Sequence, residues 1–246
     1  MRTANPALSD KVFQGYTTAT EKMTLSGTVN KSLILIFIVF MAGAFTWDLV
    51  FPEGQNALPL IPIWLYATIF GALIVAVILV LKKELAPYLA PAYAILEGCA
   101  LGIISAFFEI TYPGIVVDAI TGTVGVFVAL LLVYKSGFIK VTENFKLGVV
   151  AATGGIFLIY LVDIVMGFFG NSISFIHEGS LIGIGFSVIV IIIAALNLVL
   201  DFDFIERGVE RGAPKFMEWY AAFGLLVTIV WLYIEMLRLL AKTRSR

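Results

Sequence analysis

The sequence predicts an all-α integral membrane protein, a bundle of seven transmembrane helices. Of its 246 residues, 61% are hydrophobic and 13% are charged, whereas an ordinary soluble domain has about 25% charged residues. The mean hydropathy is +1.02. The apolar residues also come in uninterrupted runs long enough to cross a hydrocarbon core of ~30 Å, which takes about 20 helical residues. One soluble core could not bury so much apolar surface.

Seven such runs define the membrane domain, residues 32–240. They cover residues 32–50, 60–81, 87–110, 115–134, 147–169, 181–200 and 216–240. Pro87 and Pro91 fall in the first turns of the third run, where proline is tolerated because those N–H groups lack helical partners anyway. A polar N-terminal tail, residues 1–31, precedes the domain and shows no cleavable signal peptide. A basic C-terminal tail, residues 241–246, follows it.

The basic residues of the predicted loops set the orientation. All of them lie on one side of the membrane: Arg2, Lys11, Lys22, Lys31, Lys82, Lys83, Lys135, Lys140, Lys146, Arg207, Arg211 and Lys215. By the positive-inside rule this side is cytoplasmic. We therefore expect a multi-pass protein of a bacterial inner membrane with a cytoplasmic N-terminus. The basic C-terminal tail conflicts with this rule: either it lies outside, which we favour, or the last segment turns back.

Small residues recur at four-residue spacing in three runs. They are Ala94, Gly98 and Gly102 in the third run, Ala151 and Gly155 in the fifth, and Gly183 and Ser187 in the sixth. Such residues let helices approach closely in lipid, so we expect packing seams there.

The composition argues against several classes of protein. Sixteen basic and seventeen acidic residues do not favour nucleic-acid binding. The single cysteine, Cys99, excludes an internal disulfide, and the single histidine, His177, makes a histidine-rich metal or haem site implausible. A membrane serine protease would need a base inside the membrane, whereas His177 lies in a predicted outer loop. We expect neither an enzyme nor a cofactor, with calcium at most a transported ion.

Two carboxyl groups lie deep inside predicted helices, where ionisable groups are functional candidates by default. Glu97 is about ten residues into the third run, which at about 1.5 Å per residue is near the bilayer midplane. It has no Lys or Arg three or four residues away, so we expect its partner to come from another helix. Asp163, in the fifth run, is the second candidate. A proton-responsive or cation-contacting role and a structural hydrogen bond both fit these positions.

Further charged candidates lie at the ends of the last two runs. Asp201 is predicted at the C-terminus of the sixth helix, where an acid opposes the helix dipole and calls for a cation or a shared proton. Glu218 opens the seventh helix at the same level, so these two carboxylates could share a proton or hold a metal ion. Glu235 and Arg238 have the spacing of an ion pair.

Six segments carry a family resemblance. They are MTLSGTVNKSLIL, YAILEGCALGIIS, FFEITYPGIV, IKVTENF, IAALNLVLDFDFIERG and MEWYAAFGLLVTIVWLYIEMLRLL. Together they resemble the Bax inhibitor family, in its bacterial YccA-like branch, over nearly the whole chain.

The resemblance implies seven helices with the last one central, and a calcium leak that responds to pH. It also implies a proton-sensing pair of aspartates on the sixth and seventh helices and a basic residue late in the seventh that contributes to closure. Asp201 matches the first aspartate and Arg238 the basic residue. Thr228 stands at the position of the second aspartate, a departure from the family pattern.

The leading interpretation is a pH-sensitive cation (calcium) leak channel, because carboxylates and carbonyl groups are the hard oxygen ligands that calcium requires. A second interpretation is a non-conducting regulator that binds a membrane-bound AAA protease or another quality-control partner through the N-terminal tail. A third is a proton-coupled small-molecule transporter. The expected partners are the lipid bilayer, cations and a membrane protease, and no nucleic acid.

Overall fold

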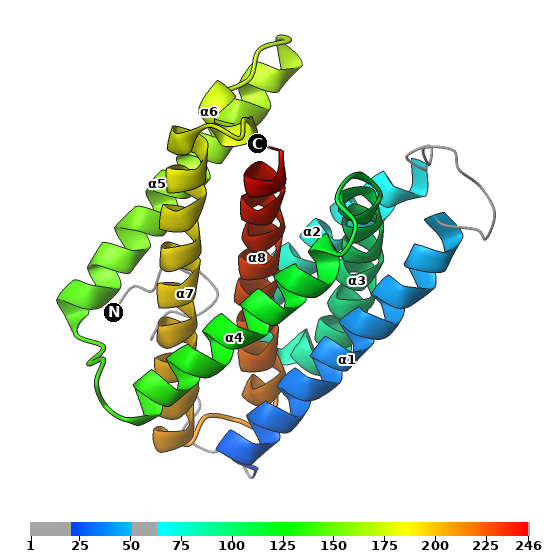
Figure 1. Ribbon diagram of the computed structural model, residues 1–246. Coiled ribbons are helices and arrows are strands. Elements are labelled where there is room, and N and C mark those ends of the chain that lie inside the picture. The colour runs from blue at the N-terminus through cyan, green and yellow to red at the C-terminus, as the bar shows by residue number, and fades with distance from the viewer. Residues whose placement is uncertain (1–20, 51–62, 246) are drawn as a thin grey trace. The chain divides into compact units, whose positions relative to one another are not determined.

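The computed structural model describes residues 21–50 and 63–245, which are almost entirely helical (Figure 1). The long helices are α1 (Leu25–Val50), α2 (Ile63–Leu81), α3 (Ala86–Thr111), α4 (Ile115–Lys135), α5 (Glu143–Phe168), α7 (Leu181–Glu210) and α8 (Met217–Arg244), with the short η3 (Lys83–Leu85) and α6 (Ser174–His177) between them. Six are long and apolar enough to cross a membrane, and α2 adds a shorter apolar stretch, Tyr66–Leu81. The predicted all-α membrane bundle is confirmed for this part of the chain.

Four helices extend by four or more residues beyond the predicted apolar runs. Helix α1 begins at Leu25 rather than 32, α5 begins at Glu143 rather than 147, α7 ends at Glu210 rather than 200, and α8 ends at Arg244 rather than 240. Apolar runs mark the part of a helix that crosses hydrocarbon, whereas polar end turns stay helical when their backbone groups are capped. The Thr142 hydroxyl, for example, accepts the N–H of Phe145 at 3.2 Å and so caps α5.

The end of α7 corrects the predicted position of Asp201. The helix stops at Gly212, whose φ of +62° suits glycine. There the Ala213 N–H bonds to the Gly208 carbonyl and the Gly212 N–H to the Val209 carbonyl, both at 3.0 Å, the bond pair of a Schellman motif. Asp201 therefore lies well inside α7, and its predicted position at a helix C-terminus was wrong.

The described chain forms two compact units. The amino unit contains the described residues up to 113 together with 204–226, and the carboxyl unit contains 114–203 and 227–245. Helices α7 and α8 thus contribute to both. The predicted boundary between tail and membrane domain at 31 falls inside α1. Residues 1–20, which hold most of the predicted partner-binding tail, lie outside the described residues.

In the amino unit, α1 packs along α3 (Figure 1). A Cβ atom placed on Gly98 would lie 2.5 Å from the Val39 carbonyl oxygen, and one on Gly102 would lie 2.3 Å from that of Gly43. The Thr46 hydroxyl adds a hydrogen bond of 3.2 Å to the Cys99 carbonyl. The predicted seam of the third run is confirmed. The seam of the fifth run is not, because the Cβ position of Gly155 meets nothing within 4 Å among the described atoms.

Candidate functional site

Asp201 is a buried carboxylate with an incomplete set of partners. Its side chain is 2% exposed and accepts a hydrogen bond from the Thr228 hydroxyl of α8. Its second oxygen, Oδ2, has no hydrogen-bond partner among the described residues. Thr228, which stands where the resemblance implies a second aspartate, therefore faces Asp201 with a hydroxyl in place of a carboxyl.

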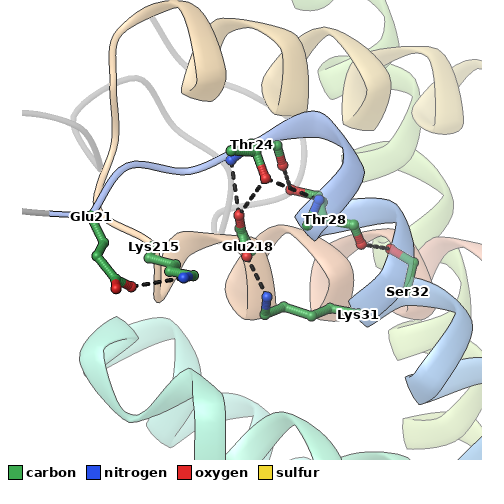
Figure 2. Close-up of polar contacts among 8 residues, drawn as sticks. Glu21, Thr24, Thr28, Lys31, Ser32, Lys215 and Glu218 are labelled. Atoms are coloured by element: carbon green, nitrogen blue, oxygen red, sulfur yellow. Dashed lines mark hydrogen bonds and ion pairs between the residues drawn. The ribbon is translucent and has the colours of Figure 1, made fainter.

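Glu218, predicted to meet Asp201, has its partners on α1 (Figure 2). Its Oε1 accepts both the N–H and the hydroxyl of Thr24 at 2.9 Å. Its Oε2 forms an ion pair with Lys31, whose ammonium also lies 5.6 Å from the centroid of the Trp219 ring. Glu218 is 1% exposed, so this ion pair is largely shielded from water. Asp201 and Glu218 belong to different units, and each has partners of its own.

The contacts of Glu218 complete a capping box across two helices. The Thr24 hydroxyl caps α1 by accepting the Gly27 N–H at 3.0 Å. In a capping box, an acidic side chain three residues after the cap accepts the N–H of the cap residue. Here that position is Gly27, and a Cβ atom on it would lie 2.1 Å from Glu218 Oε1. The absent side chain leaves room for Glu218, which supplies the carboxylate from α8.

A short antiparallel backbone pairing continues this contact. The Met23 N–H bonds to the Ala213 carbonyl at 2.6 Å, and the Lys215 N–H bonds to the Glu21 carbonyl at 3.1 Å. The side chains of Glu21 and Lys215 also pair at 2.8 Å, and this hydrogen bond raises the pKa of Lys215. Figure 2 shows the side-chain contacts that join residues 21–31 to residues 213–218.

Glu97, the deepest predicted carboxyl group, has a partner on its own helix. It hydrogen-bonds with the hydroxyl of Tyr93, four residues earlier in α3. The prediction that its partner comes from another helix was wrong, because a tyrosine hydroxyl on α3 takes the place that a cationic neighbour would have at this spacing. The Tyr93 ring packs edge-on against Phe223 of α8, 4.9 Å between ring centroids.

Glu235 and Arg238 form the ion pair that their spacing predicts. The guanidinium donates to Glu235 Oε1 at 3.0 Å, and the Tyr160 hydroxyl of α5 donates to the same oxygen at 2.8 Å. Arg238 lies 5.0 Å from the centroid of the Tyr160 ring. Glu235 is 1% exposed, and its Oε2 has no hydrogen-bond partner in the described part of the chain.

Asp163 holds the segment that follows α5. It accepts the Ile173 N–H at 2.9 Å and pairs with the ring of His177 at 2.8 Å. These contacts favour a structural hydrogen-bonding role for Asp163 over a proton-responsive or cation-contacting role. They also give His177 a partner, although its side chain is 56% exposed.

Among the described residues, no group of three or more His, Cys, Asp or Glu side chains is placed to hold a metal ion. The metal role predicted for Asp201 and Glu218 stays a prediction.

Comparison with known protein families gives a match over nearly the whole chain. The family model described as "Bax inhibitor 1 like" matches residues 5–245. The chain belongs to this family. No curated protein and no solved structure matched it.

Sequence reasoning missed three polar contacts of this Bax inhibitor 1 like protein. The Lys146 ammonium, 2% exposed, pairs with Asp203 of α7 at 3.2 Å. The Asn197 amide of α7 donates to the Thr153 hydroxyl of α5 at 2.8 Å. Lys242 of α8 donates to Ser187 of α7 at 2.8 Å. All three join residues more than 40 positions apart, and no local spacing signals them.

Replacing Tyr160 by phenylalanine is expected to lower the free energy of unfolding by about 1.5 kcal/mol, since it removes a donor to a buried carboxylate. Unfolding by SDS in mixed micelles measures this difference. Tyr66→Phe is the control, because Tyr66 is 52% exposed on α2 and should change little. Equal stability of both variants would show that the hydrogen bond to Glu235 contributes nothing.

Proposed function

We propose that this Bax inhibitor 1 like protein is a pH-sensitive calcium leak of a bacterial inner membrane, with its N-terminus in the cytoplasm. Calcium moves down its gradient through the protein without a chemical step, so the protein is not an enzyme. Asp201 is the group that responds to protons.

The incomplete coordination of Asp201 carries this proposal. A carboxylate shielded from water costs free energy unless hydrogen bonds or cations compensate its charge. Thr228 compensates one oxygen, and Oδ2 remains without a partner among the described residues. A proton or a cation on Oδ2 would supply what is missing. Asp201 therefore has two states that differ in charge, which is what a pH switch requires.

Thr228 makes this switch simpler than one with two aspartates. Two neighbouring carboxyl groups lose their protons in two coupled steps. A threonine hydroxyl does not ionise in this pH range, so the Asp201–Thr228 pair takes up one proton. The pH dependence of the leak should follow a single titration step.

Calcium flux into proteoliposomes across a pH series tests the proposal. Asp201→Asn should abolish the pH dependence and hold the flux at the low-pH level of the wild type, because the amide resembles the protonated acid. Thr228→Asp should convert the single step into two. Glu210→Gln is the matched control, since it makes the same change at an exposed position of α7 and should leave the profile unchanged.

Two results would reject the proposal. One is a wild-type flux equal to that of empty liposomes at every pH. The other is a pH profile unaffected by Asp201→Asn, alone or combined with Glu97→Gln, which removes a second carboxyl group predicted to respond to protons.

A further inference from the structure

A lysine is buried where the last turn of α8 meets the start of α7. Lys242 is 6% exposed. Its ammonium donates to the Gly183 carbonyl at 3.1 Å and to the Ser187 hydroxyl at 2.8 Å. Ser187 is itself 1% exposed. A buried ammonium is costly without partners, and both of its hydrogen-bonding partners here are neutral oxygen atoms.

Two charged groups that act on Lys242 lie on its own helix. Glu235 and Arg238 are close enough for their charges to act on the ammonium. Arg238 pairs with Glu235 Oε1, whereas Glu235 Oε2 is buried and without a partner among the described residues. Without Lys242, this place would keep the Gly183 carbonyl and the Ser187 hydroxyl, and the charge of the Glu235 carboxylate would still act on it. These are the ligand types that a hard cation such as calcium prefers.

The segment before α7 is pressed against this end of α8. A Cβ atom on Gly179 would lie 2.9 Å from the Lys242 carbonyl oxygen and 2.5 Å from the Ser245 hydroxyl. Arg244 pairs with Asp118 of α4 two residues further along. The last turn of α8 is therefore held from two sides, which fixes the ammonium against Gly183 and Ser187.

We propose that the Gly183 carbonyl, the Ser187 hydroxyl and the Glu235 carboxylate form a cation site that the protein fills with its own Lys242 ammonium. This inference rests on the proposed function and adds a closing group to it. The tethered ammonium keeps free calcium out of this end of the carboxyl unit. Removing the ammonium opens the site to calcium.

The binding test compares Lys242→Met with Lys140→Met, which removes an exposed lysine. Each purified protein is heated with and without calcium chloride. Calcium at about 30 times its dissociation constant should raise the melting temperature of Lys242→Met by about 5 °C, because a ligand that binds the folded state stabilises it. Wild type and Lys140→Met should show no such rise. Absence of a calcium-dependent rise in folded Lys242→Met overturns the inference.

Lysine labelling keeps the inference testable if Lys242→Met does not fold. A water-soluble amine reagent, read out by mass spectrometry, should modify Lys140 of the wild type and leave Lys242 protected. Ser187→Ala should speed the labelling of Lys242 by about threefold to tenfold, the effect of losing one hydrogen bond. Equal labelling rates of Lys242 and Lys140 in the wild type overturn the inference.

Flux measurements separate this inference from the proposed function. In conducting proteoliposomes, Lys242→Met should raise calcium flux about tenfold, equivalent to about 1.4 kcal/mol off the barrier. Unchanged flux, with a conducting wild type, overturns the closing role of Lys242. If neither protein conducts, the leak proposal fails, while the melting and labelling results still decide the cation site.

Discussion

Glu218→Ala is expected to lower the free energy of unfolding by about 3–5 kcal/mol, the usual cost of removing one partner of a buried ion pair. Three hydrogen bonds end on this carboxylate, from the Thr24 N–H, the Thr24 hydroxyl and the Lys31 ammonium. The variant leaves Lys31, which is 17% exposed, without its counter-charge, and it leaves the first turn of α1 with one uncapped N–H group.

Moving the carboxylate to α1 should recover part of the stability that Glu218→Ala loses. Gly27→Glu in the Glu218→Ala background places an acid three residues after the cap, where it can accept the Thr24 N–H as in a single-helix capping box. The new side chain also stands four residues before Lys31, the favourable order for an ion pair on one helix. We expect it to recover about 1–2 kcal/mol.

In the wild type, the same substitution should lower the free energy of unfolding instead of raising it. With Glu218 present, the Cβ atom of residue 27 would lie 2.1 Å from Oε1, so Gly27→Glu should destabilise the protein. SDS unfolding in mixed micelles, followed by tryptophan fluorescence, measures all four proteins of this cycle. If Gly27→Glu has the same effect in both backgrounds, the Glu218 carboxylate does not occupy the space next to Gly27.

The helices and their closest packing could be predicted from the sequence because those signals are local. A run of about 20 apolar residues needs a helix in lipid whatever its neighbours are. The spacing of Gly98 and Gly102 predicts a face without side chains, and that face is where α1 approaches. The Glu235–Arg238 pair was predictable for the same reason, since both partners lie on one helix turn.

The partners of the buried charges could not be predicted, because each depends on a residue far away in the chain. Depth predicts that Glu218 meets Asp201, whereas its carboxylate accepts the N–H of Thr24, the cap residue of α1, 194 residues earlier in the chain. Lys242 was counted as part of a basic tail, yet its ammonium is buried against α7. Depth and charge identify which groups need a partner, but they do not identify which helix supplies it.

Asp201 shows what a resemblance adds. The end of the apolar run at residue 200 predicts a helix end beside it, which is wrong, whereas the resemblance aligns Thr228 with the second aspartate of a pair, and Thr228 does form a hydrogen bond with Asp201. An aligned position carries three-dimensional information that composition and periodicity lack.

Gly102→Ala is expected to lower the free energy of unfolding by about 2–3 kcal/mol, near the upper end for overpacking a tight contact. The added methyl group would lie 2.2 Å from the Thr46 hydroxyl and 2.3 Å from the Gly43 carbonyl oxygen. A backbone atom cannot rotate away, so α1 and α3 must separate. Their separation would also stretch the hydrogen bond from Thr46 to the Cys99 carbonyl.

Gly125→Ala in α4 is the matched control, because its Cβ position meets nothing within 4 Å among the described atoms. There the substitution should stabilise the helix by about 0.5–1 kcal/mol, since alanine loses less conformational entropy than glycine. The two variants make the same chemical change with opposite expected signs, so helix propensity cannot account for the difference between them. If SDS unfolding shows Gly102→Ala to be as stable as Gly125→Ala, α1 and α3 are not in backbone contact, and the small residues at four-residue spacing in α3 do not mark a packing seam.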